Sequence, residues 1–297
     1  MLDIGILPSR GGKIDSIFDR RSGREWLTQP AQDPLPNLSY GMEFTTADMA
    51  GWDEMMPTII GGATPMGDGA LPDHGEVWSV PWDVVSADDS AVTLEVTGRA
   101  MPYRFRRTAR LSAANVLRLE YTVEATADVP VQLLWAAHPQ FAWMPGARVE
   151  LPDGIKRVLD VMADPPVEVE WNRRLACLLD HVEVGTGHKV WLLPDERPTW
   201  SRLRDPDGGA VTLRWDGSVV RYLGIWFDAE AYAREPVVAL EPSTGFYDDL
   251  ARAVAGDRAD AVGPHDPSSW ILEVAVEPPS DEDVDGIVKT MEWTENK

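Results

Sequence analysis

Apolar and polar side chains alternate at every second position along much of the chain. Residues 92–98 read VTLEVTG, with valine and leucine on one face and threonine and glutamate on the other. Segments 117–124 (LRLEYTVE) and 211–217 (VTLRWDG) repeat the pattern. A period of two is typical of a β-strand with one buried face. The pattern therefore predicts strands in all three segments.

Turn-forming residues separate these segments at short intervals. Clusters of Asp, Gly, Pro and Ser occupy residues 19–25, 86–90, 151–154 and 205–209. Many short strands joined by such turns favour an antiparallel sandwich or barrel. We therefore predict a mainly β protein, a large antiparallel β-sandwich that forms one domain over residues 1–297.

Helical patterning is scarce and confined to the last fifty residues. Residues 248–256 (DDLARAVAG) and 280–291 (SDEDVDGIVKTM) are expected to form short helices. Ser280 is a suitable N-cap for the second helix, and acidic residues in its first turn match the helix dipole.

The composition excludes several classes of protein. Cys177 is the single cysteine in 297 residues, so no disulfide framework can form, and no Cys/His spacing suggests zinc. The first residues do not resemble a signal peptide, and no apolar run approaches eighteen residues. We expect a cytoplasmic protein without a membrane span, a metal or a cofactor.

The net charge of −22 narrows the range of ligands. Such a charge repels nucleic acids and anionic membranes, and it disfavours anionic substrates. The thirteen tryptophans provide many flat apolar faces, which suit sugar rings as well as core packing. A small-molecule sugar, a monosaccharide, is therefore the expected partner, while the oligomeric state is not predicted.

Three residues in apolar or loop contexts are candidates for proton transfer. His138 lies in VQLLWAAHPQFAW (131–143) and is either a packed core histidine or a proton donor in a pocket. Glu241 follows the apolar run Val-Val-Ala-Leu, so burial should raise its pKa toward that of a useful base. His74 precedes a glycine in LPDHGEVWSVPW (71–82). No GxSxG or HExxH motif occurs, so neither a serine nucleophile nor a zinc-protease site has support.

Four segments, in order, resemble the aldose 1-epimerase (galactose mutarotase-like) family. They are GWDEMMPTI, PDHGEVWSVPW, HPQF and ALEPSTG, and the likeness extends from residue 13 to about residue 250. The resemblance implies a large β-sandwich (supersandwich) whose open face binds a sugar without a cofactor. The implied reaction is mutarotation, in which the α and β anomers of an aldose interconvert by ring opening and closure.

The resemblance also implies roles for individual residues. By the match of the HPQF segment His138 is the acid, and by the match of ALEPSTG Glu241 is the base. The HG loop adds His74 as a third catalytic residue. Imidazolium at His138 and carboxylate at Glu241 would be the productive starting pair. We expect these two groups to face one pocket about 6–8 Å apart, so that a pyranose contacts both. The expected substrate-binding residues are Asp53, Glu54, Asp180, Trp78 and Trp82, and Trp52, Trp135 and Trp143 are further candidate stacking faces.

The chain departs from the family where sugar specificity resides. Well-studied members carry an Asn-Arg pair ahead of the HG loop, whereas this chain has Asp53 and Glu54 there. The preferred aldose is therefore not predicted. An alternative is a hexose-6-phosphate 1-epimerase, for which Arg104 and Arg106 could bind the phosphate. Two further alternatives are a non-catalytic carbohydrate-binding protein and a lyase or hydrolase with a second carboxylate beside Glu241.

Overall fold

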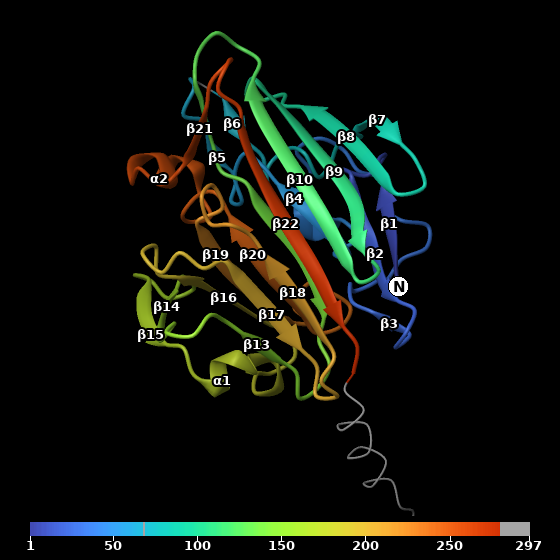
Figure 1. Cartoon of the computed structure of the whole chain (residues 1–297). Helices are drawn as coiled ribbons and strands as arrows, with labels where there is room; N and C mark the ends of the chain where they lie inside the picture. Colours follow the sequence, from blue (N-terminus) through green and yellow to red (C-terminus); the bar gives the residue numbers. More distant parts are fainter. Residues whose placement is uncertain (68, 280–297) are drawn as a thin grey trace, which may run out of the picture.

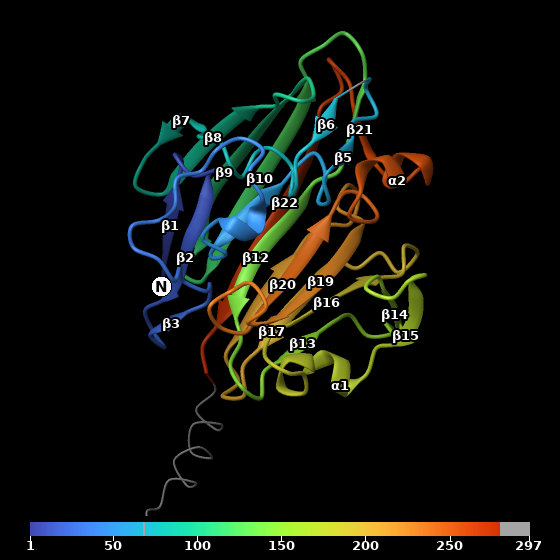
Figure 2. The same ribbon diagram turned by 180° about the vertical axis from the view of Figure 1, so that it is seen from behind.

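The protein consists of two large antiparallel sheets packed face to face, as seen in a computed structural model that describes residues 1–67 and 69–279. The ten-stranded sheet faces the reader in Figure 2, and the eight-stranded sheet faces the reader in Figure 1. Buried apolar side chains from both sheets fill the space between them. The predicted fold class is confirmed.

The ten-stranded sheet contains the strands that later prove to form the site. In spatial order it comprises β1 (Leu2–Leu7), β2 (Lys13–Asp19), β4 (Trp52–Met55), β12 (Ala136–Ala142), β20 (Val237–Ser243), β19 (Tyr222–Ala229), β16 (Thr186–Leu192), β14 (Arg157–Asp160) and β15 (Val167–Glu170), with β3 (Arg24–Glu25) paired to β2. The central strands β12 and β20 are buried along their whole length.

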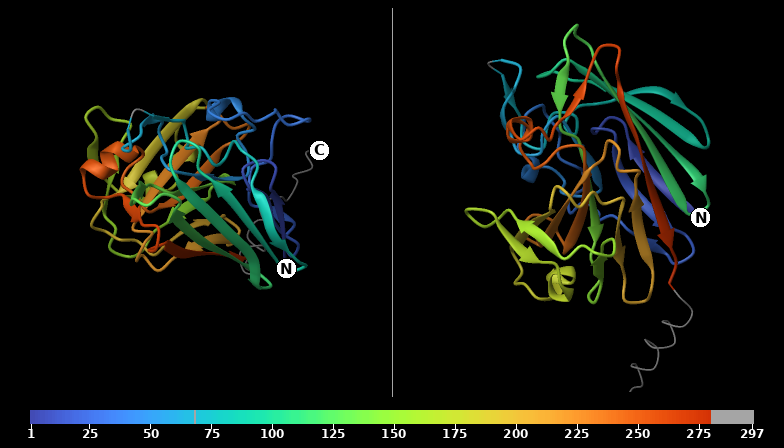
Figure 3. Two further views of the ribbon diagram at one scale, coloured as in Figure 1. Left: turned by 90° about the horizontal axis from the view of Figure 1, so that it is seen from above. Right: turned by 60° about the vertical axis from the view of Figure 1, so that its left-hand side comes forward.

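The eight-stranded sheet covers the other side of the core. Its order is β13 (Arg148–Glu150), β17 (Trp200–Arg204), β18 (Ala210–Arg214), β22 (Ser268–Glu277), β10 (Val116–Ala125), β9 (Tyr103–Ala113), β8 (Ala91–Thr97) and β7 (Asp83–Ala87). Two small pairs complete the strands, β11 (Val131–Leu133) with β21 (Asp260–Val262) and β5 (Gly62–Ala63) with β6 (Ala70–Leu71). The edge strand β1 meets the turn between β9 and β10 near the N-terminus (Figure 3), where the Leu2 amide donates to the Ala114 carbonyl at 3.0 Å.

The three strands predicted from alternation are present as β8, β10 and β18. The last of them ends at Arg214, three residues before the predicted end, because the chain turns at Asp216 and Gly217. There the Ser218 amide donates to the Asp216 carboxylate at 2.8 Å, and Gly217 adopts a positive φ of 75°.

Helices are few, as the sequence predicts. They are α1 (Arg173–Ala176), α2 (Leu250–Ala255) and the 3₁₀ turns η1 (Phe44–Thr46) and η2 (Leu178–Asp180). The helix expected at 248–256 is α2, which Asp249 caps by accepting from the Arg252 amide at 2.6 Å. The helix expected at 280–291 lies outside the described residues. No helix within residues 1–67 and 69–279 is long and apolar enough to span a bilayer.

Candidate active site

A cavity of about 320 Å³ opens on the face of the ten-stranded sheet that points away from the second sheet. Its volume is at the lower end for small-molecule sites, so it suits one sugar ring better than an oligosaccharide. The loops after β4, β6, β14, β19 and β20, together with η1, surround it. Its lining residues are Phe44, Thr45, Met49, Ile59, Ile60, Asp73, His74, His138, Val161, Met162, Lys189, Trp226, Tyr232, Glu241 and Asp248.

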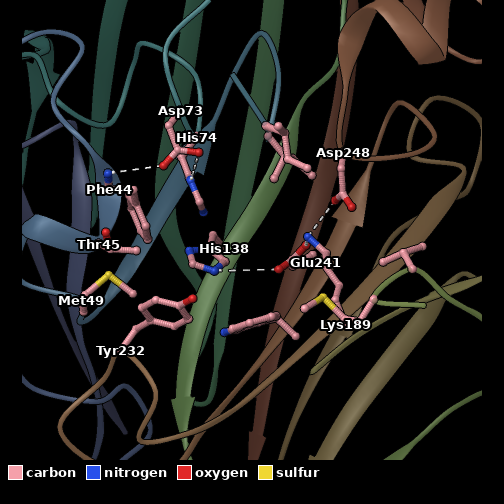
Figure 4. A pocket seen from close by; sticks show the side chains of 15 residues that line it. Phe44, Thr45, Met49, Asp73, His74, His138, Lys189, Tyr232, Glu241 and Asp248 are labelled. Atoms are coloured by element: carbon pink, nitrogen blue, oxygen red, sulfur yellow. Dashed lines mark hydrogen bonds and ion pairs between the residues drawn. The ribbon is translucent and has the colours of Figure 1, made fainter. Parts of the chain in front are cut away.

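His138 and Glu241 face each other on the floor of this cavity (Figure 4). They lie on the paired strands β12 and β20, whose register matches Ala136 with Ser243 and Gln140 with Ala239, so the two residues are directly opposite. Opposite residues on antiparallel strands project from the same face of a sheet. His138 Nε2 is 3.8 Å from Glu241 Oε1, closer than the 6–8 Å expected from sequence.

His138 is both a buried histidine and a residue of the pocket, the two interpretations that its sequence context left open. Its side chain is buried, with the residue only 4% exposed, yet Nε2 borders the cavity. Burial, together with the neighbouring His74 and the Lys189 ammonium, holds the pKa of His138 well below its ordinary value. The imidazole of His138 is therefore neutral at pH 7, which differs from the imidazolium expected as the starting form.

Glu241 is the most enclosed carboxylate of the cavity, with 1% exposure. Burial raises its pKa, as its apolar strand predicts, while the Lys189 ammonium acts in the opposite direction. The neighbouring strand makes room for the carboxylate with Gly224, which pairs with Glu241 across β19 and β20. A Cβ at residue 224 would lie 3.0 Å from Glu241 Oε2 and 3.0 Å from the Trp191 ring.

Lys189 and Asp248 are site residues that sequence reasoning missed. Lys189 Nζ, from β16, lies 2.7 Å from Glu241 Oε2 and 2.8 Å from Asp248 Oδ1, so one ammonium bridges two carboxylates. Burial disfavours this charge, but Asp248 and Glu241 outweigh it and raise the pKa of Lys189. The available signal was a lysine within the strand TGHKVWL (186–192), because a buried lysine needs an acidic partner.

His74 projects into the cavity from a loop whose backbone is fixed on several sides. Its φ of 57° is uncommon for a non-glycine residue, and its amide donates to the Ile59 carbonyl at 2.6 Å. The imidazole stacks on Phe44 with ring centroids 4.0 Å apart, and its Nδ1 lies 3.0 Å from Asp73 Oδ1 (Figure 4). Burial acts against the Asp73 carboxylate, but the interaction with His74 leaves its pKa below the ordinary value. The His74 and His138 ring centroids are 5.5 Å apart, so the structure brings both histidines to one wall.

The acidic pair expected to bind substrate lies outside this lining. Asp53 is buried beside Lys13, whose Nζ is 2.6 Å from Asp53 Oδ2, and burial raises the pKa of Asp53 to about 6. Glu54 points into the core, where it accepts from Arg107, Tyr121 and Trp135 at 2.8–3.0 Å. Each of the two carboxylates therefore has a basic partner within the protein, and neither belongs to the lining of the cavity.

The remaining expected contacts also lie elsewhere. Asp180 accepts from the Trp143 indole and the Gly146 amide, each at 2.9 Å. Trp78 and Trp82 are buried and donate to backbone carbonyls at 3.1 and 2.9 Å. The other candidate stacking faces, Trp52, Trp135 and Trp143, are likewise buried, and the tryptophan that lines the cavity is Trp226.

Comparison with known proteins supports the fold. No protein-family model and no curated protein sequence matches this chain. Similar solved structures include a proposed aldose 1-epimerase from Escherichia coli K12, with TM-score 0.70, 16% identity and coverage of 93% of this chain and 96% of that one. A galactose mutarotase-like protein from Lactobacillus casei gives TM-score 0.68, 16% identity and coverage of 93% and 97%. A galactose mutarotase related enzyme from Lactobacillus acidophilus gives 0.69, 14% identity and coverage of 95% and 96%.

Proposed function

The chain has the fold of galactose mutarotase-like proteins, and we propose that it is an aldose 1-epimerase acting on a neutral aldose. The observation that carries the proposal is the placement of His138 Nε2 and Glu241 Oε1 3.8 Å apart on the floor of a ring-sized cavity. Anomer exchange requires a base at O1 and an acid at O5, and both oxygens are bonded to C1. Two proton-transfer groups this close can therefore serve both oxygens of one bound ring.

The reaction proceeds by one reversible proton exchange. Glu241 takes the proton from the O1 hydroxyl while His138 gives its Nε2 proton to O5, and the C1–O5 bond breaks to give the open-chain aldehyde. Rotation about C1–C2 presents the other face of the carbonyl to the O5 hydroxyl. Ring closure returns one proton to His138 and takes the other from Glu241, so the protein ends unchanged. Lys189 keeps Glu241 ionised, because its ammonium favours the carboxylate form.

The pKa directions predict an acidic pH optimum. The productive form needs protonated His138, whose fraction falls as the pH rises above the lowered pKa of His138, and ionised Glu241, whose fraction falls as the pH drops below the raised pKa of Glu241. We expect kcat/KM, corrected for the uncatalysed rate, to peak below pH 6.5 and to fall about tenfold per pH unit on the alkaline side. A rate that rises steadily from pH 6.5 to 8 would contradict this assignment of acid and base.

The charges on the cavity wall favour free sugars over sugar phosphates. Among the described lining residues there is no arginine, and Lys189 already bridges two carboxylates. Arg104 and Arg106, the candidate phosphate ligands, lie on β9 of the other sheet and pair with Glu124 and Glu95 at 3.0 and 2.6 Å. The feature that would have supported a hexose-6-phosphate epimerase is therefore absent from this cavity.

A comparison of glucose with glucose 6-phosphate tests this preference. A phosphomonoester carries nearly two negative charges at pH 7, and one unit of repulsion at 4 Å costs about 4 kcal/mol at an effective dielectric of 20. We expect turnover of glucose and little or none of glucose 6-phosphate, at low and at high salt. A preference for the phosphate that weakens as salt is added would favour the sugar-phosphate alternative.

A further inference from the structure

The mouth of the cavity carries an unusual concentration of exposed apolar side chains. Ile60, Met162 and Tyr232, here called the apolar rim, are 51%, 56% and 52% exposed and all line the cavity. They come from three separate loops, those after β4, β14 and β19, so no single strand pattern explains their convergence. Exposed apolar side chains grouped at one place mark a contact surface.

The polar side chains of the same cavity are largely occupied by each other. Lys189 bridges Glu241 and Asp248, and Asp73 engages His74 (Figure 4). Apart from Thr45, His138, the Trp226 indole and the Tyr232 hydroxyl, the rest of the described lining is aliphatic, thioether or phenyl, and it includes no asparagine, glutamine or arginine. Hydroxyl groups distant from C1 would therefore find few hydrogen-bonding partners, and a buried hydroxyl without a partner weakens binding.

Resting on the proposed function, we infer that the aldose bears an apolar group, a methyl or a larger alkyl or aryl substituent, in place of a hydroxyl remote from C1. The reacting end of the ring lies against His138 and Glu241, and the substituent packs on the apolar rim. Each CH₂ removed from water at such a surface strengthens binding by about fourfold. The apolar rim thus determines which sugar binds, and His138 and Glu241 on the floor of the cavity carry out the proton transfers.

Equilibrium binding of matched sugars tests the inference independently of turnover. Using isothermal titration of the full chain, we expect 6-deoxy-D-galactose to bind at least about fivefold more tightly than D-galactose, because it lacks a hydroxyl that would be buried without a partner. 6-O-benzyl-D-galactose, which adds apolar carbons over the rim, should bind more tightly still. Ile60→Ser, Met162→Ser and Tyr232→Ser should each reduce this preference, measured as the ratio of the dissociation constants of D-galactose and 6-deoxy-D-galactose. Val84→Ser is the matched control, because Val84 is similarly exposed (54%) on β7 of the other sheet.

The outcomes separate this inference from the proposed function. Equal or tighter binding of D-galactose, or a preference that survives all three rim variants, overturns the apolar substituent. If 6-deoxy-D-galactose is preferred in binding but mutarotation is not accelerated, the proposed epimerase activity is overturned and the inference of an apolar substituent is supported. Absence of binding by all three sugars overturns both.

Discussion

Replacement of Glu241 by glutamine should remove most of the acceleration of mutarotation, at least about a hundredfold in kcat. The amide is nearly isosteric with the carboxylate, so it fits the space that Gly224 leaves and can still accept a hydrogen bond from Lys189. It cannot take the O1 proton. The fold and the affinity for sugar should therefore persist while the catalysed rate disappears.

Polarimetric time courses measure the catalysed rate, and sugar titrations of the same preparation measure the affinity for sugar. Glu196→Gln is the matched control, since Glu196 is exposed and lies outside the cavity lining. Catalysis by the Glu241 variant at the rate of the unmodified protein would remove Glu241 as the base.

Replacement of Lys189 by methionine should shift the pH optimum of kcat/KM upward and lower kcat/KM on the acidic limb of the profile by at least about tenfold. Two buried carboxylates, Glu241 and Asp248, then lose their shared ammonium, so the pKa of Glu241 rises further. The pKa of His138 rises as well, because Lys189 no longer opposes its protonation. Both limbs of the pH profile therefore move in the same direction.

A stability measurement accompanies this variant. Removal of one partner from a buried ion pair costs about 3–5 kcal/mol, so the free energy of unfolding should fall by a similar amount at pH 7. The loss should shrink as the pH falls and the carboxylates become protonated in both states. Lys156→Met, at an exposed lysine, is the control and should change neither the pH profile nor the stability. A Lys189 variant with the original pH optimum would show that the ammonium does not tune the pair.

The sequence predicts the fold well because its signals are local. Strands such as β8 and β10 are visible as alternation within seven to ten residues, and the turns between strands have their own residue types. Glu241 and His138 are identifiable because a titratable group within an apolar run either has a function or a buried partner. What alternation does not reveal is which strands are neighbours.

The remaining residues of the site depend on which strands are neighbours in the sheet. Lys189 meets Glu241 only because β19 brings β16 and β20 into one sheet, a pairing of segments far apart in the chain. Asp53 and Glu54 are equally dependent on distant partners: Lys13 on β2 and Arg107 on β9 satisfy them in the interior. An acid in a buried strand therefore looks the same in sequence whether it contacts a ligand or a basic side chain of the core.

The optical rotation of freshly dissolved α-aldoses, followed with and without the protein at pH 6, tests the central claim most directly. With α-D-glucose, α-D-galactose and its 6-deoxy analogue, we predict a first-order approach to equilibrium whose rate increases in proportion to protein concentration for at least one sugar. The final rotation should be unchanged, because an epimerase alters only the rate. A rate equal to that of buffer for every aldose, with sugar binding retained, would contradict the account and identify the protein as a carbohydrate-binding module.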